Sequence, residues 1–128
     1  SKNQAPIPAD DKNHEKGWVT RSNMKLIFND DNKSIIIETP KGKKVTIDEK
    51  TDKIQLEDEH RNKIIMDKNG IVVESGKDLT LKATKDIKLE GINIEQKAQA
   101  TFKAESQGQA QIQATADLVI KGTFVRIN

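Results

Sequence analysis

The residues best able to hold a metal or move a proton gather in one acidic stretch, Glu57-Asp58-Glu59-His60. Carboxylates beside a histidine are a common donor set for metal ions. Consecutive residues of a strand point to alternating sides, however, so these side chains do not converge as ligands must. We therefore interpret the stretch as a solvated turn between strands. His14 lies in a polar segment near the N-terminus and is expected to be exposed.

Two acidic loops and one basic run offer weaker sites. Asp30-Asp31 and the stretch from Asp67 to Gly70 have neither the ligand spacing nor the closing Glu of an EF-hand. Asn, Asp and Gly accept the backbone angles of tight turns, so both loops are expected to be turns. Lys41-Gly42-Lys43-Lys44 could bind phosphate, but a solvated hairpin tip is the simpler interpretation.

No known catalytic arrangement is visible in the sequence. It has no Ser/His/Asp set, no Gly-rich phosphate loop and no HExxH motif. Cysteine is absent, which excludes disulfides, thiol catalysis and Cys-bound zinc. The net charge is +2 and no basic face stands out, so a nucleic-acid surface is not indicated. We expect no enzymatic activity, no catalytic residue, no bound metal, no cofactor and no nucleic-acid partner.

The composition raises the question of what holds the chain together. Hydrophobic residues make up 34% of it, aromatic residues 3% and charged residues 33%, against roughly 45–50% apolar residues in ordinary domains. Few large side chains are therefore present to offset the conformational entropy lost on folding. Either the chain is disordered, or it shares a core with other chains.

Short apolar pairs separated by turn residues follow one another from residue 24 to 89. The pairs are Leu26/Phe28, Ile35/Ile37, Val45/Ile47, Ile54/Leu56, Ile64/Met66, Ile71/Val73, Leu79/Leu81 and Ile87/Leu89. Gly, Asn, Asp and Pro lie between them, which is typical of an all-β repeat. We divide the chain into a linker and joint at 1–20, an upper β-repeat at 21–76, which could be prism or hairpins, and a narrow β-helix with a tip at 77–128.

From Ile92 the turns disappear while the alternation continues. Thirteen of the seventeen even positions from 92 to 124 are apolar, whereas Val119 is the one apolar odd position between 93 and 123. This period of two predicts a strand, although the Ala, Gln, Lys and Glu content favours a helix. A straight strand of this length would span about 100 Å, far beyond globular strands. The segment must therefore fold into short strands or wind around an axis.

Winding together with partner chains would pair the strand edges and bury the apolar alternation on a shared axis. Many small residues suit an axis where several backbones approach closely, so we expect a narrow threefold core. The fold class predicted is all-β, an intertwined homotrimeric β-helix or β-prism with a less regular β region and a linker toward the N-terminus. The residues expected in its interior are Leu79, Leu81, Ile87, Leu89, Ile92, Ile94, Ala98, Ala100, Phe102, Ala104, Ala110, Ile112, Ala114, Ala116, Leu118, Ile120 and Phe124.

Three tracts resemble a known family: 79–94 (LTLKATKDIKLEGINI), 96–105 (QKAQATFKAE) and 119–128 (VIKGTFVRIN). Together they are similar to the C-terminal β-helical spike of VgrG proteins and of contractile phage tails. The segments 17–22 (GWVTRS) and 25–30 (KLIFND) resemble the place where such proteins leave their oligonucleotide-fold domain and join the spike. On this resemblance Trp18 packs at the joint, and hub and oligonucleotide-fold domains are expected upstream.

The resemblance implies a rigid trimeric needle of a contractile injection apparatus, such as type VI secretion. It would be assembled in the bacterial cytoplasm, driven through a target membrane on firing, and joined upstream to hub and tube components. A PAAR-type tip protein would dock on the C-terminal end, formed by Thr123, Phe124, Val125, Arg126, Ile127 and Asn128. The His-x-His motif that gathers iron at some phage tips is absent, so no tip metal is expected. A polysaccharide-degrading tail spike and a passive adhesin stalk remain the alternatives.

Overall fold

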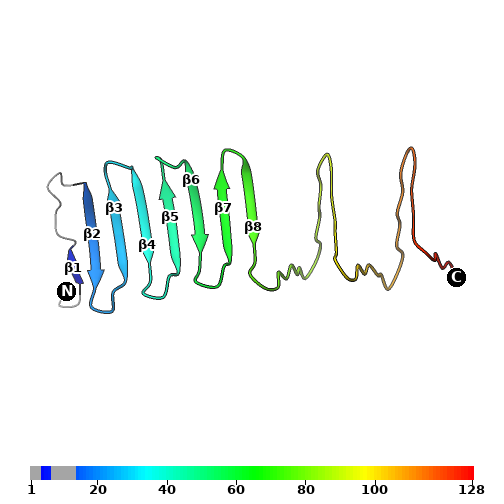
Figure 1. The fold of residues 1–128 in the computed structure, drawn as a ribbon, viewed down its shortest axis with the longest axis horizontal. Helices are drawn as coiled ribbons and strands as arrows, with labels where there is room; N and C mark the ends of the chain where they lie inside the picture. Colours follow the sequence, from blue (N-terminus) through cyan, green and yellow to red (C-terminus); the bar gives the residue numbers. More distant parts are fainter. Residues whose placement is uncertain (1–3, 7–13) are drawn as a thin grey trace. The chain divides into compact units, whose positions relative to one another are not determined.

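The computed structural model describes residues 4–6 and 14–128, and this part of the chain is all β, with no helix. Eight strands form one sheet in which every strand pairs antiparallel with the next strand along the chain (Figure 1). The strands are β1 (Gln4–Pro6), β2 (Glu15–Thr20), β3 (Lys25–Asn29), β4 (Ser34–Glu38), β5 (Lys44–Asp48), β6 (Lys53–Glu57), β7 (Lys63–Asp67) and β8 (Gly70–Glu74).

Turns with local side-chain hydrogen bonds join these strands. The carboxylate of Asp48 accepts from the backbone N–H of Lys50 at 2.9 Å, and that of Asp67 accepts from the N–H of Asn69 at 2.8 Å. Asp52 and Gly70 have positive φ angles of 57° and 123°. Asp, Asn and Gly tolerate such turns, which is why the punctuation in the sequence locates them. The acidic loops at 30–31 and 67–70 are confirmed as turns.

The register from β3 to β8 is continuous, and it sorts side chains strictly between two faces. Residues opposite one another across neighbouring strands lie on the same face, while successive residues of a strand alternate. One face, which we call the apolar face, carries only apolar residues in two rows. The rows are Leu26, Ile37, Val45, Leu56, Ile64 and Val73, and Phe28, Ile35, Ile47, Ile54, Met66 and Ile71.

The other face, called here the polar face, carries a row of alternating charge beside a mixed row of Ile27, Ile36, Thr46, Gln55, Ile65 and Val72. The members of the charged row face one another in the order Lys25, Glu38, Lys44, Glu57, Lys63 and Glu74. The Nζ of Lys63 lies 3.2 Å from the Oε2 of Glu74. Each cross-strand pair of opposite charge contributes about 0.2–1 kcal/mol. A slip of the register by one strand residue would lose these pairs and turn the apolar rows to the other side.

The sheet is a single layer without a hydrophobic core of its own. No hydrophobic residue in the described part of the chain is buried, and Ser34 is the one buried polar residue there. Several members of the apolar face, among them Ile37, Leu56 and Ile71, are exposed. The alternating β pattern has therefore produced a face ready for burial that this chain alone does not cover.

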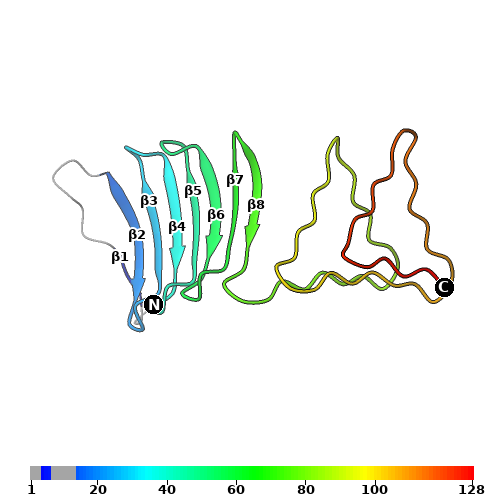
Figure 2. The same cartoon turned by 45° about the vertical axis from the view of Figure 1, so that its right-hand side comes forward.

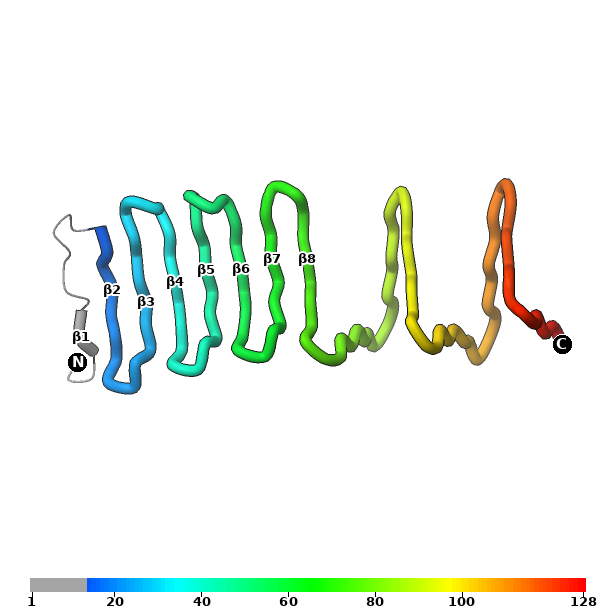
Figure 3. The backbone as a smooth tube through the Cα atoms, viewed as in Figure 1, coloured from blue at the N-terminus to red at the C-terminus, as the bar shows by residue number. Residues whose placement is uncertain are grey.

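Residues 77–128 are extended but belong to no sheet. None of them makes a backbone–backbone hydrogen bond to another described residue. The chain divides into two units, residues 1–85 and 86–128. In the second unit, extended stretches run in different directions between bends, so the chain coils around open space (Figures 2 and 3). Winding is thus observed, whereas intertwining with other chains stays a prediction.

Residues 21–76, predicted as an upper β-repeat that could be prism or hairpins, form a regular meander of hairpins. Within 1–20, predicted as a linker and joint, β2 pairs along its length with β3, and Trp18 faces Leu26 in that register. Gly17 permits this pairing, since a Cβ there would collide with the carbonyl oxygen of Leu26. Residues 1–3 and 7–13 lie outside the described part.

The tight β7–β8 turn gives a test of the hairpin geometry. Gly70→Ala places a side chain at φ 123°, a region that costs a non-glycine residue about 1–3 kcal/mol. We expect thermal unfolding to show a clear loss of stability. The control is Gly108→Ala, where an added Cβ meets no atom within 4 Å. Equal melting of the two variants would contradict the observed turn.

Candidate self-association surface

The apolar face is the largest functional surface that the sheet presents. Burying one aliphatic side chain fully contributes about 1.5–3 kcal/mol. The residues of the two rows are about half exposed in the single chain, so their complete burial would add a stabilisation on the order of 10 kcal/mol, comparable with the net stability of a domain. An exposed contiguous patch of this kind marks a protein interaction site.

The apolar face continues into the segment that leaves the sheet. A hollow of about 410 Å³ at this end is lined by Leu56, Ile64 and Val73 of the face and by Leu79, together with polar residues of the turns. Leu79 is the first interior residue predicted for the winding segment. One apolar surface therefore runs from the sheet to the start of the winding segment, also called the coil below.

The predicted interior residues of 79–124 all lie in the winding segment, and all of them are exposed in the single chain. This segment cannot bury them by itself, because it makes no sheet and coils around open space. Whether their alternate row faces a shared axis is not tested by one chain, so that assignment stays a prediction.

Sequence reasoning omitted the apolar face from the predicted interior. The same apolar pairs were recognised as strand signals, but the pairing register was needed to show that they lie in two continuous rows. The signal was present, since each pair is spaced i, i+2 and is followed by a turn. Alternation within a strand predicts a half-buried sheet, and this pattern alone was sufficient to include them.

The six residues predicted to dock a cap lie at the chain end. Phe124, Val125 and Ile127 are exposed apolar side chains there. No groove is built around them, and the segment contributes only consecutive residues of one extended stretch. The docking role is therefore still a prediction.

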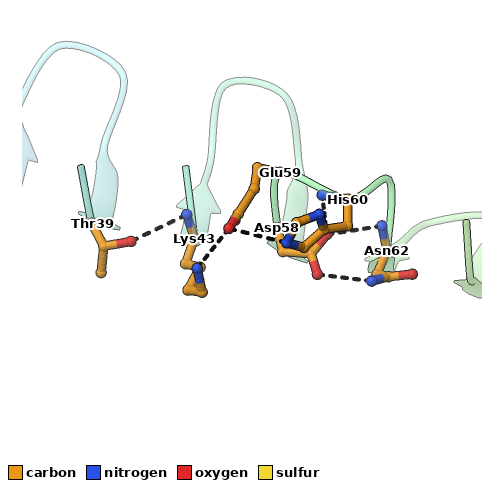
Figure 4. A network of polar contacts seen from close by, with 6 residues as sticks. All are labelled: Thr39, Lys43, Asp58, Glu59, His60 and Asn62. Atoms are coloured by element: carbon orange, nitrogen blue, oxygen red, sulfur yellow. Dashed lines mark hydrogen bonds and ion pairs between the residues drawn. The ribbon is translucent and has the colours of Figure 1, made fainter. Parts of the chain in front are cut away.

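The acidic stretch forms a polar network in the β6–β7 turn (Figure 4). The Nζ of Lys43 lies 2.7 Å from the Oε1 of Glu59, and the Nε2 of His60 lies 3.3 Å from the same oxygen. The hydrogen bond from Lys43 lowers the pKa of the Glu59 carboxyl. The side chains of Lys43 and His60 are well exposed, that of Glu59 is partly buried, and the network connects two neighbouring turns. The interpretation of this stretch as a solvated turn is confirmed.

Asp58 organises the same turn from its other side. Its Oδ2 accepts from the Nδ2 of Asn62 at 2.8 Å, and its Oδ1 accepts from the backbone N–H groups of His60 and Asn62. The side-chain hydrogen bond from Asn62 is the main cause that lowers the pKa of Asp58. In the described residues no group of three or more histidines and carboxylates is arranged to hold a metal ion.

Asn62 also fixes the place where the chain leaves the sheet. Its Oδ1 accepts from the backbone N–H of Gly76 at 2.9 Å, and the hydroxyl of Ser75 donates to the carbonyl of Asp78 at 2.7 Å. A Cβ at Gly76 would collide with the carbonyl oxygen of His60. Asp58, Asn62 and Gly76 therefore form a junction clamp between the last hairpins and the winding segment.

Comparison with known proteins gives one family. The model of the phage baseplate V C-terminal trimerisation domain matches residues 34–95, which run from β4 through β8 into the winding segment. The match supports a region of the phage-tail or VgrG type, so the broader part of the resemblance is confirmed. No curated protein matches the chain. In the described residues, no helix is long and apolar enough to cross a membrane.

The junction clamp predicts a specific dependence on pH. Because the pKa of Asp58 is lowered by folding, its stabilising contribution is present above pH 3.8, the ordinary value for an aspartic carboxyl, and is lost as pH falls through the folded value. Asp58→Asn sets two amide groups against each other at Asn62, so we expect a lower melting temperature at neutral pH.

This difference should shrink when both proteins are melted below pH 3.8. Asp67→Asn is the matched control, because its turn bond to the Asn69 N–H needs only a carbonyl oxygen. A deficit of Asp58→Asn that is equally large in acid would show that the carboxylate charge plays no part.

Proposed function

We propose that this chain is the trimerising spike of a phage-tail or VgrG-type protein, a structural part without enzymatic activity. The observation that carries the proposal is a single-layer sheet whose apolar face is uncovered and continues into a coil that makes no backbone–backbone hydrogen bond to the described residues. Other copies of the chain can supply both the missing apolar contacts and the missing hydrogen bonds. The matched trimerisation domain supports a homotrimer.

In this assembly three sheets would pack their apolar faces around one axis, forming a prism. Below them the three coils would intertwine as a β-helix and pair their open edges. Continuous hydrogen bonds between chains and a filled interior give stiffness along the axis. Intertwined chains also separate slowly, so the needle would resist heat and detergent kinetically.

The exterior chemistry fits passage through an envelope. Lys, Glu, Gln and Thr occupy the odd positions from 95 to 115, including Gln107, Gln109, Gln111 and Gln113. Such a polar surface is not stabilised by the hydrocarbon core of a bilayer. We propose that the spike is assembled in the bacterial cytoplasm, fires outward and punctures a target membrane, with residues 123–128 of three chains docking a PAAR-type tip protein.

A polysaccharide-degrading tail spike is less well supported. Such enzymes need paired carboxylates and benefit from aromatic side chains in a groove. The hollow at the junction has Asp58 and Asp78 in its lining but no aromatic residue. A passive adhesin stalk would have the same trimeric β fold, and it differs from the spike only in lacking a cap on its end.

Self-association through the apolar face is tested by a pair of neighbouring substitutions. Ile54→Asp puts three carboxylates into the proposed core, at a cost of about 3 kcal/mol or more per uncompensated charge. Gln55→Asp changes the adjacent residue on the polar face. Sedimentation at micromolar concentration should show trimers for the parent chain and Gln55→Asp, and dissociated or unfolded chains for Ile54→Asp. A monomeric, folded parent chain would overturn the proposal.

The tip assignment has its own test. We expect a PAAR-type protein to be retained by the immobilised trimer and lost after deletion of residues 123–128. The deletion variant must keep its trimer mass, so that loss of the cap is separated from loss of assembly. Equal retention by both proteins would place the docking surface elsewhere, and no retention by either would favour the adhesin stalk.

A further inference from the structure

The bends of the winding segment recur at regular intervals. They lie at residues 76–77, 84–85, 92, 99–100, 107–108, 115–116 and 123. Counted from the last residue of each bend, the steps are eight residues, except for two steps of seven that end at Ile92 and Thr123. An odd step inverts the alternation of a strand, because side chains alternate with a period of two.

Counted from the bends, the apolar residues occupy the same two positions in each step. The second and fourth residues after each bend are Leu79 and Leu81, Ile87 and Leu89, Ile94 and Gln96, Phe102 and Ala104, Ala110 and Ile112, Leu118 and Ile120, and Val125 and Ile127. Gln96 is the one polar member. This register explains why the apolar residues are odd-numbered up to Leu89, even-numbered from Ile94 to Ile120, and odd-numbered again at Val125 and Ile127.

Exposure in the single chain supports the same register. The large second residues, Leu79, Ile87, Ile94, Phe102, Leu118 and Val125, are all 53–63% exposed, which indicates equivalent surroundings. The large fourth residues range from 65% at Leu89 to 88% at Ile127, beside the chain end. Ile92 and Phe124, which simple alternation places in the interior, are 101% and 85% exposed, and Ile92 lies at a bend while Phe124 directly follows one.

A glycine precedes the bend that closes each short step. A Cβ at Gly91 would lie 3.3 Å from the carbonyl oxygen of Asn93, and a Cβ at Gly122 would lie 3.0 Å from that of Phe124. Both glycines therefore meet the same neighbour, the carbonyl two residues ahead. Gly108, beside an eight-residue step, has no atom within 4 Å of such a Cβ. The bends of the short steps thus favour glycine, because a Cβ at either position would be in tight contact with that carbonyl oxygen.

We propose that Gly91 and Gly122 are two register shifts of the interface between copies of this chain. At each shift the inward row changes parity, so Ile94, Val125 and Ile127 face the neighbouring copies, while Ile92 and Phe124 lie outside the interior. The inference rests on the proposed trimer and names the residues through which the copies meet. It also leaves Phe124 as an outward apolar side chain near the tip.

Single cysteines test the register directly, because the natural chain contains none. Ile92→Cys and Ile94→Cys are compared with the outward control Glu95→Cys in the full chain, by maleimide labelling under native conditions. Ile94→Cys should label at least about tenfold more slowly than the control, since the interface around residue 94 must open locally before the thiol can react with the maleimide. Ile92→Cys should label at about the rate of the control. Phe124→Cys and Val125→Cys form the corresponding pair at the tip.

The outcomes separate the register from the trimer itself. Protection of both Ile92→Cys and Ile94→Cys overturns the shift and restores simple alternation. Free labelling of both means that no shared interior exists there, and the proposed function fails first. Gly91→Ala should also melt below Gly108→Ala, because only the former displaces a backbone carbonyl. Equal melting would remove the glycine argument.

Discussion

The missing partner of the apolar alternation is the constraint on which the whole structure depends. In the sheet, alternation creates a face that a single layer cannot bury, and in the coil it creates a row around open space. The backbone of the coil has the same deficiency, since it makes no backbone–backbone hydrogen bond to any described residue. Unpaired backbone groups and apolar side chains are removed from water together only when strands from other copies are added.

The two parts of the chain meet this constraint in different ways. From β2 to β8 the chain pairs with itself, and only its apolar face needs partners. Beyond the junction clamp of Asp58, Asn62 and Gly76 the chain no longer pairs with itself. There both the backbone edges and the inward row of apolar side chains need partners. A self-paired sheet can form locally, while the coil depends entirely on association.

Much of this architecture is readable from residue types. Asp, Asn and Gly located the turns correctly, and six of the eight apolar pairs lie in strands, because local backbone preference decides both. The other two pairs, Leu79/Leu81 and Ile87/Leu89, lie in the winding segment, which forms no sheet. The prediction of a linker and joint at 1–20 gave no bounds for β2, whose strand character depends on pairing with β3 and on a close approach at Gly17. The two faces became visible only with the register. The seven-residue steps were hidden because alternation was counted along the sequence rather than from the bends.

Backbone hydrogen exchange tests the central claim most directly, because residues 86–128 contain amides with no backbone acceptor inside the chain. If other copies supply these acceptors, the amides of the coil should be among the slowest to exchange in the protein, and unfolding the assembly should abolish their protection. Exchange of this segment at the rate of an unstructured peptide, in a sample whose sheet amides are protected, would contradict the account.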